Sequence, residues 1–291
     1  MSDITSIKDV FRQTEGMLRG VGIDDAFTEA RILLQHVLDV DGAGFLLRLD
    51  DSLDPRVKNT IDEVVRRRLR REPLAYIVGH IEFYDIDVIV DSRVLIPRPE
   101  TEILVETALD WLRERHGNPY IVDVGTGSGC VAVTIARHCP QANIVAIDTS
   151  RDALEVAMQN IDHYELGGRI IVRHDDLLRN HELPIDLLVA NLPYIPTEDI
   201  HGLMPEVRDY EPRSALDGGS GGLHIIQNIL LQARDFISST GALIFEIGFG
   251  QAAEAKALAL RHFPFAEIRL INDFAGVERI LAIHLVDDEN P

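Results

Sequence analysis

The order of apolar and polar positions divides this chain into a shorter helical part and a longer part in which strands and helices alternate. From residue 3 to residue 72 the apolar residues recur three and four positions apart, as at Leu33, Leu34, Val37 and Leu38. Pro73 follows the last of these stretches, as is typical just beyond a helix. The spacing predicts a small helical bundle over residues 1–73, which forms the first domain.

Residues 74–91 show a different pattern, in which β-branched and aromatic residues gather in two short segments. One segment is Tyr76-Ile77-Val78, and the other runs from Ile86 to Val90. Such segments are typical of strands. We therefore expect a β-hairpin over residues 74–91 that links the two domains.

From residue 92 to residue 291, short apolar runs alternate with amphipathic stretches. Strands are predicted over residues 121–122, 144–147, 170–173, 185–190, 242–247, 268–272 and 279–285, and helices over residues 131–138, 151–162, 223–236 and 252–261. This alternation predicts a Rossmann-like α/β fold with a mostly parallel, seven-stranded sheet covered on both faces. Ligands of such sheets bind at the carboxyl ends of the strands.

A glycine turn follows the first strand of this domain and opens a helix. It consists of Asp123, Val124, Gly125, Thr126, Gly127, Ser128 and Gly129. Glycines permit a tight turn and let a ligand approach the backbone closely. Dinucleotide sites prefer G-x-G-x-x-G, whereas this G-x-G-x-G spacing, with an acid two residues before the first glycine, is the form that binds S-adenosyl-L-methionine. We predict that the turn, apart from Val124, binds that cofactor; a turn without a ligand is the alternative.

Acidic residues follow the next two strands. Asp148 lies 19 residues after Gly129, where a carboxylate can accept hydrogen bonds from both ribose hydroxyls of a nucleoside. The alternative for Asp148 is a helix cap, because a helix begins nearby. Asp176 follows the third strand, where an acid can meet the adenine amino group, and Asp175 competes for that role.

The segment Asn191-Leu192-Pro193-Tyr194 follows the fourth strand and indicates the chemistry. An amide or exocyclic amine nitrogen is planar and a poor nucleophile, so the site must hold its NH₂ group with two acceptors. The side-chain oxygen of Asn191 and the backbone carbonyl of the next residue can serve. Tyr194 can stack on the planar group, and Pro193 stiffens the loop. A turn after a buried strand is the alternative.

These segments together resemble the protein-glutamine N5-methyltransferases that modify peptide chain release factors, the HemK/PrmC family. The resemblance extends over nearly the whole chain, and its most family-specific segment runs from Leu95 to Glu102. The other segments are Pro73 to Gly79, Glu82 to Tyr84, Asp123 to Gly129, Asn191 to Tyr194, Tyr210 to Pro212 with Ala215-Leu216 and Gly218-Gly219, and Phe245 to Gly248 with Gly250-Gln251.

The resemblance implies a helical N-terminal domain that grips the release factor and a catalytic domain that methylates the glutamine of its Gly-Gly-Gln motif. It implies that the cofactor contacts Gly125 to Gly129, Asp148, Leu177 and Asn191. It also implies that Asn191 to Tyr194 hold the glutamine. Arg98 and Glu100 are expected to line the site, with a structural ion pair as the alternative.

Leu192 departs from the family pattern, which usually has proline at this position. Leucine keeps the same backbone carbonyl but adds an N–H and loosens the loop. The Asn-Leu-Pro-Tyr form is familiar from enzymes that dimethylate adenines in ribosomal RNA. An adenine-N6 methyltransferase acting on nucleic acid is therefore the principal alternative. A nicotinamide oxidoreductase has no use for Asn191 to Tyr194, and a non-catalytic binding module would tolerate the loss of Asn191.

The net charge of −20 argues against nucleic-acid binding, since clustered Lys and Arg supply most of that affinity. One basic run, Arg66 to Arg71, is either a solvated helix face or a patch that steers a partner or RNA. No apolar run approaches the roughly 20 residues that cross a bilayer, and the first residues lack the features of a signal peptide. The two cysteines show no metal-ligand spacing. We expect a cytoplasmic monomer without a metal.

Overall fold

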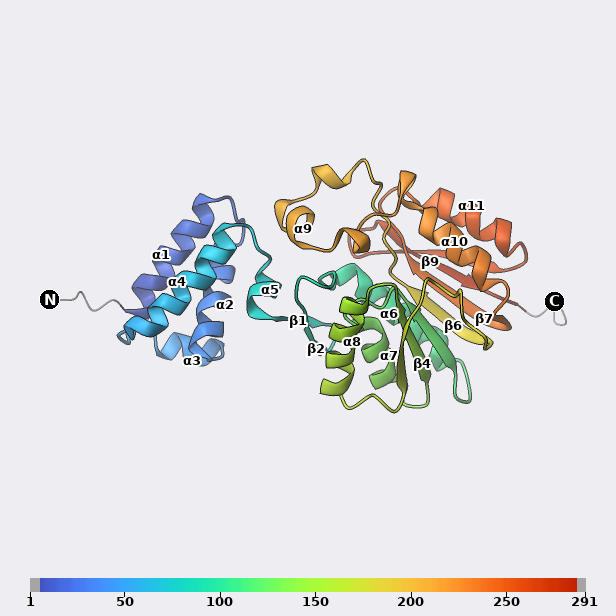
Figure 1. The fold of residues 1–291 in the computed structure, drawn as a ribbon, viewed down its shortest axis with the longest axis horizontal. Helices are drawn as coiled ribbons and strands as arrows, with labels where there is room; N and C mark the ends of the chain where they lie inside the picture. Colours follow the sequence, from blue (N-terminus) through green and yellow to red (C-terminus); the bar gives the residue numbers. More distant parts are fainter. Residues whose placement is uncertain (1–5, 287–291) are drawn as a thin grey trace. The chain divides into compact units, whose positions relative to one another are not determined.

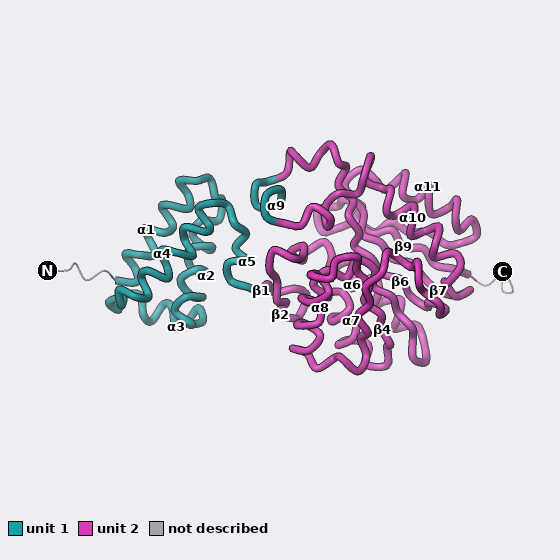
Figure 2. The backbone as a smooth tube through the Cα atoms, in the orientation of Figure 1, with its two compact units in different colours: residues 1–79, 204–210 teal, residues 80–203, 211–291 magenta. Residues whose placement is uncertain are grey.

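The computed structural model describes residues 6–286, which form two compact units (Figure 2). Unit 1 contains residues up to 79 together with residues 204–210, and unit 2 contains residues 80–203 and those from 211 onward. Each unit has a hydrophobic core of its own. The first five residues of the predicted bundle lie outside the described residues.

Unit 1 is a helical bundle, as the spacing of its apolar residues predicted. Its helices are α1 (Ile7–Gly20), α2 (Ala26–Leu38), α3 (Gly42–Leu47), α4 (Pro55–Leu69), α5 (Leu74–Val78) and α9 (Pro205–Tyr210). Ser6, Asp25, Asp41 and Asp54 cap the first four helices by accepting hydrogen bonds from backbone N–H groups in the first turn. Their shared core includes the fully buried side chains of Leu18, Leu33, Leu34, Phe45 and Ile61.

The strand predicted at Tyr76-Ile77-Val78 is wrong, because these residues form helix α5. Pro73 occupies the N-cap position, and Gly79 ends the helix in a left-handed conformation with φ of 91°. Tyr76 and Ile77 bury their side chains, so packing overrides the β-propensity of this tripeptide. The hairpin is shorter than expected and consists of β1 (His80–Phe83) and β2 (Ile86–Ile89), both in unit 2.

Unit 2 contains the predicted seven-stranded sheet. Its strands are β3 (Tyr120–Val124), β4 (Asn143–Asp148), β5 (Ile170–His174), β6 (Ile185–Ala190), β7 (Ile237–Glu246), β8 (Glu267–Asn272) and β9 (Glu278–His284). Their order is β5-β4-β3-β6-β7-β9-β8. The first five strands are parallel, and β9 runs antiparallel to β7 and β8. The Rossmann-like α/β fold is thus confirmed.

Helices cover both faces of this sheet (Figure 1). Helices α6 (Pro99–Arg113), α7 (Cys130–His138) and α8 (Arg151–His163) lie on one face, and α10 (His224–Ala233) and α11 (Ala252–His262) lie on the other. The sequence pattern had not yielded α6, although Pro99 stands in its first turn and Leu104, Ala108 and Trp111 are buried at helical spacing. No described helix is long and apolar enough to span a bilayer.

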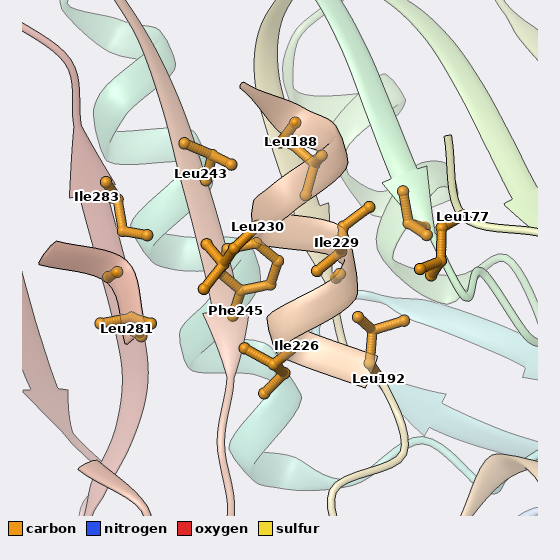
Figure 3. Close-up of a cluster of buried hydrophobic side chains, with 14 of the residues drawn as sticks. Leu177, Leu188, Leu192, Ile226, Ile229, Leu230, Leu243, Phe245, Leu281 and Ile283 are labelled. Carbon is orange, nitrogen blue, oxygen red and sulfur yellow. The ribbon is translucent and has the colours of Figure 1, made fainter. Parts of the chain in front are cut away.

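The core of unit 2 reaches the loop that follows β6. Figure 3 shows Ile226 and Leu230 of α10 beside Phe245 of β7, with Leu192 at the edge of the same cluster. The Leu192 side chain is only 4% exposed. The leucine that departs from the family pattern therefore anchors the loop in the core, whereas the sequence had suggested a looser loop.

Candidate functional site

A cavity of about 230 Å³ opens at the carboxyl ends of β3, β4 and β6, where the fold predicts a ligand. Its walls come from unit 2 alone. Most of the residues predicted to bind the cofactor line it: Asp123, Gly125, Thr126, Gly127, Ser128, Asp148, Asp176, Leu177 and Asn191. Leu192, Pro193 and Thr101 complete the side nearest to the loop after β6.

The glycine turn has a shape that other residues would strain. Gly125, Gly127 and Gly129 have φ values of 73°, 54° and 78°, in the left-handed region. A Cβ atom on Gly129 would lie 3.2 Å from the Cβ atom of Ala157 in α8, so this glycine also permits close helix packing. A Cβ atom on Gly125 would lie 3.1 Å from a methyl carbon of Leu192. The turn and the loop after β6 are therefore in close contact.

Asp123 lies buried beneath the turn and holds it from within. Its carboxylate accepts a 2.6 Å hydrogen bond from the hydroxyl of Thr126. Burial raises the pKa of Asp123 to about 7, because a charged carboxylate loses its hydration there. This side chain supports the shape of the turn.

Asp148 stands at the end of β4 and faces the same cavity. One of its carboxylate oxygens accepts a 3.0 Å hydrogen bond from the N–H of Gly127, and the other accepts a 2.8 Å bond from the N–H of Ser150. The cap of α8 is Ser150, whose side chain accepts from Ala153. A carboxylate has about four acceptor positions, so Asp148 retains capacity for two hydroxyl donors. Burial raises its pKa.

Asp175 and Asp176, the two candidates after β5, differ in their surroundings. Asp175 is buried, and its oxygens accept hydrogen bonds from the N–H of Asp176 and from both the backbone and the side chain of Asn180. Asp176 is exposed and pairs with Arg179 at 2.8 Å. Asp175 therefore serves the loop, and Asp176 keeps an accessible carboxylate.

The loop after β6 is held by bonds that come from distant parts of the chain. The side-chain NH₂ of Asn191 donates to the hydroxyl oxygen of Thr101 at 3.0 Å. The hydroxyl of Tyr194 donates to Glu246 at 3.0 Å, and the Tyr194 carbonyl accepts from the side chain of Gln251 at 2.8 Å. A Cβ atom on Gly218 would lie 2.6 Å from the carbonyl of Pro193, so the next loop must carry glycine there.

Arg98 and Glu100 do not pair with each other, and among the described residues the cavity walls include neither of them. Arg98 forms an ion pair with Glu211, whose side chain is 1% exposed and also accepts from the N–H of Ile96. This pair fastens the segment before α6 to the segment after α9. The structural ion pair weighed for Arg98 from the sequence therefore exists, with Glu211 as its partner.

The sequence had assigned no role to Thr101, Glu246 or Gln251, although all three fall in segments that carry the family resemblance. The local indication in the sequence is an acid, Glu246, that directly follows an apolar run and precedes a glutamine by five residues. Their partners are 145, 90 and 57 residues away in the chain, so no sequence spacing could reveal them.

The basic run of unit 1 is largely neutralised. Arg68 is 5% exposed and binds Glu29 and Glu206, Arg71 also binds Glu206, and Arg67 binds Glu72. Arg66 and Arg70 remain exposed. This arrangement favours a structural role for the run over a patch that steers nucleic acid.

The fold and the turn define a Rossmann-like methyltransferase, and comparisons with known proteins narrow the class. The PrmC N-terminal domain family matches residues 9–79, and the methyltransferase small domain family matches residues 100–204. The release factor glutamine methyltransferase of Geobacter sulfurreducens is 37% identical over 280 residues, which cover 96% of each chain. That of Rhodopirellula baltica is 36% identical over 275 residues, which cover 93% of each.

A solved methyltransferase structure from Pyrococcus furiosus, which is 16% identical, aligns with a TM-score of 0.51 over 68% of this chain and 88% of its own. At this level of identity the likeness concerns the fold alone. The sequence matches extend over both units, so the chain belongs to the family of release factor glutamine methyltransferases.

Proposed function

We propose that this protein transfers a methyl group from S-adenosyl-L-methionine to the side-chain amide nitrogen, N5, of the glutamine in the Gly-Gly-Gln motif of a peptide chain release factor. The observation that carries the proposal is the orientation of Asn191. Its NH₂ group is bound by Thr101, which turns its oxygen toward the other side, where a planar NH₂ group can donate to it. The names of its relatives supply the substrate class.

The cavity fits this cofactor on three counts. The glycine turn brings backbone close to the space that an amino-acid group would fill, Asp148 has spare acceptor capacity for a ribose diol, and Asp176 beside Leu177 can meet an adenine amino group. When bound, S-adenosyl-L-methionine supplies a methyl group made electrophilic by a sulfonium. We assign the turn to its amino-acid part, Asp148 to its ribose, and Asp176 with Leu177 to its adenine.

Positioning provides most of the proposed catalysis. The lone pair of an amide nitrogen is delocalised, so the nitrogen must be held in line with the methyl carbon until they react. The Asn191 oxygen and the Leu192 carbonyl would accept the two N–H groups, and Tyr194 would stack on the amide plane. In the transfer the C–N bond would form as the S–CH₃ bond breaks, with S-adenosyl-L-homocysteine as the leaving group, and the nitrogen would give up one of its protons to solvent. The bundle of unit 1 is proposed to bind the release factor.

The test is methyl transfer from labelled S-adenosyl-L-methionine to a purified release factor, in its wild-type form and with the Gly-Gly-Gln glutamine replaced by alanine. Label in the wild-type factor alone is the expected result. Equal label in both factors would overturn the assigned residue. Label in ribosomal RNA or DNA, with none in either factor, would establish the adenine alternative, which the same two acceptors could serve.

A further inference from the structure

A chain of hydrogen bonds runs from the end of β7, through the first turn of α6, to the loop after β6. The hydroxyl of Thr101 donates to one carboxylate oxygen of Glu246 at 2.7 Å, and the Thr101 oxygen accepts from the NH₂ of Asn191 at 3.0 Å. The other oxygen of Glu246 accepts from the hydroxyl of Tyr194 at 3.0 Å. One carboxylate is thus connected to both ends of the segment from Asn191 to Tyr194.

The direction of this chain follows from its first member. When Glu246 is ionised its carboxylate can only accept hydrogen bonds, so the Thr101 proton then points at Glu246. The Thr101 oxygen then offers a lone pair, and only the NH₂ end of Asn191 can bind it. A carboxamide without such a neighbour could turn over, because its oxygen and nitrogen ends have nearly the same shape. The two bonds therefore fix which end of Asn191 faces the acceptor site.

Burying the carboxylate of Glu246 costs free energy, because a charged group loses its hydration. Its side chain is 1% exposed, and its hydrogen-bond partners are two neutral hydroxyls. The charged groups that act on it are Glu100 and Arg279, and Arg279 is itself paired with Asp273. Burial raises the pKa of Glu246. Since an apolar side chain would cost less in such a place, the carboxylate calls for a reason beyond packing.

We propose that Glu246 and Thr101 are positioning residues, which hold Asn191 with its oxygen toward the substrate and hold the Tyr194 ring in place, so that the site accepts an NH₂ group and rejects a carboxylate. The proposal rests on the proposed function and adds a basis for substrate selection. Glu246 is not among the residues that line the cavity, so it would act through its partners. Hydrogen-bonded chains also polarise their members, which makes the Asn191 oxygen a better acceptor.

Thr101→Val is the first test, because valine has nearly the shape of threonine without the hydroxyl. We expect kcat to fall about 10- to 100-fold, with the Kd of the cofactor changed less than about threefold. Thr101→Ser restores the hydroxyl and is expected to recover most of kcat. Glu246→Gln leaves a single acceptor oxygen for two donors and is expected to lower kcat at least about tenfold, whereas the exposed control Glu278→Gln is not. The proposed role of the hydrogen-bond chain would be overturned if Thr101→Val kept the wild-type kcat. It would also be overturned if Thr101→Ser and Thr101→Val lowered kcat equally.

A second readout reports the orientation itself. In a release factor with glutamate in place of the Gly-Gly-Gln glutamine, the carboxylate oxygens would face the side-chain oxygen of Asn191. Both groups are acceptors, so no hydrogen bond forms between them. This factor should therefore inhibit wild-type enzyme poorly. In Thr101→Val the Asn191 amide can present its NH₂ group, so inhibition by the glutamate factor should strengthen at least about tenfold relative to KM for the glutamine factor. An unchanged ratio would contradict the proposal, since general loosening of the site does not favour glutamate.

The labelling results distinguish a wrong substrate from a wrong role for the hydrogen-bond chain. If wild-type enzyme labels an adenine and no release factor, the substrate is wrong, and the Thr101 variants are then compared on that adenine amine, which needs the same acceptors. If wild-type enzyme labels the release factor and Thr101→Val labels it equally well, the substrate is correct and the proposed role of the hydrogen-bond chain is wrong.

Discussion

Glu206 of unit 1 and Glu246 of unit 2 are surrounded by opposite kinds of partner. In unit 1 the guanidinium of Arg68 lies between Glu29 and Glu206, at 2.5 Å and 3.0 Å, so each carboxylate faces a cation. In unit 2 the carboxylate of Glu246 accepts its hydrogen bonds from the neutral hydroxyls of Thr101 and Tyr194. The first arrangement brings opposite charges into contact, and the second pairs a carboxylate with neutral groups.

The pKa directions reflect this difference. Burial alone would raise the pKa of Glu206, but hydrogen bonds from its own backbone, Arg68 and Arg71 outweigh burial and lower it. Burial prevails at Asp123 and Glu246 and raises both pKa values. The partly buried Glu206 of α9 pairs with two arginines of the bundle, and in unit 2 the buried Glu211 likewise pairs with Arg98. Among the described residues, Asp123 at the cavity and Glu246 behind the loop after β6 accept their side-chain hydrogen bonds from neutral hydroxyls instead.

Replacing Asn191 tests the positioned side most severely. Asn191→Ala removes the proposed acceptor, so turnover should fall at least about 100-fold while the cofactor Kd changes only a few-fold. Turnover is measured by label transfer and Kd by calorimetry. Asn118→Ala, at an exposed position, serves as the matched control. Turnover near the wild-type level would contradict the proposal that Asn191 accepts a hydrogen bond from the target NH₂ group.

Replacing Arg68 tests the charge-cancelling side. Arg68→Ala leaves Glu29 without its cation and should lower the free energy of unfolding of unit 1 by about 3–5 kcal/mol. Arg66→Ala removes an exposed arginine from the same run and should change it by less than about 0.5 kcal/mol. Hydrogen exchange of the α4 amides reports the unit specifically. Equal effects of the two variants would mean that the ion pairs of Arg68 add no more to the free energy of unfolding than an exposed arginine does.

The pH dependence of stability should have opposite signs in the two regions. Because the folded pKa of Asp123 is about 7, the folded protein keeps a proton that the unfolded chain loses near pH 4. Stability from this group is present below pH 4 and declines as the pH rises to 7, by at most about 1.4 kcal/mol per pH unit. Asp123→Asn should remove that decline in denaturant unfolding without cofactor. Parallel pH profiles of variant and wild type would refute the assignment.

Glu206 should show the reverse dependence, because its pKa is lower in the folded protein than in the unfolded chain. The stability that Glu206 contributes is present above the unfolded pKa and is lost as the pH falls through the folded pKa.

Asp148 lies between the two cases, since backbone N–H groups rather than a cation bind its carboxylate. Asp148→Ala should weaken cofactor binding about 10- to 100-fold, because hydrogen bonds to a charged acceptor contribute about 1.5–3 kcal/mol. Calorimetry measures the change, and Asp152→Ala in the exposed first turn of α8 is the control. Unchanged affinity in Asp148→Ala would assign this acid to the turn alone.

Local patterns in the sequence foretold much of the fold. The G-x-G-x-G turn, the strand before it and the helix after it depend on residues only a few positions apart, and all of these appear in the structure. Prediction failed at Tyr76-Ile77-Val78, where burial in the bundle outweighed propensity, and α6 was missed.

The sequence by itself determined the class of fold, the glycine turn and the loop from Asn191 to Tyr194, because each depends on contiguous residues whose backbone requirements are local. Only the tertiary structure decided how that loop is held. Thr101, Glu246 and Asn191 come together because α6, β7 and β6 pack side by side, and a hydrogen bond between residues 145 positions apart leaves no periodicity in the chain. The same applies to Arg68, whose partner Glu206 lies 138 residues away and converts a basic run into a buried ion pair.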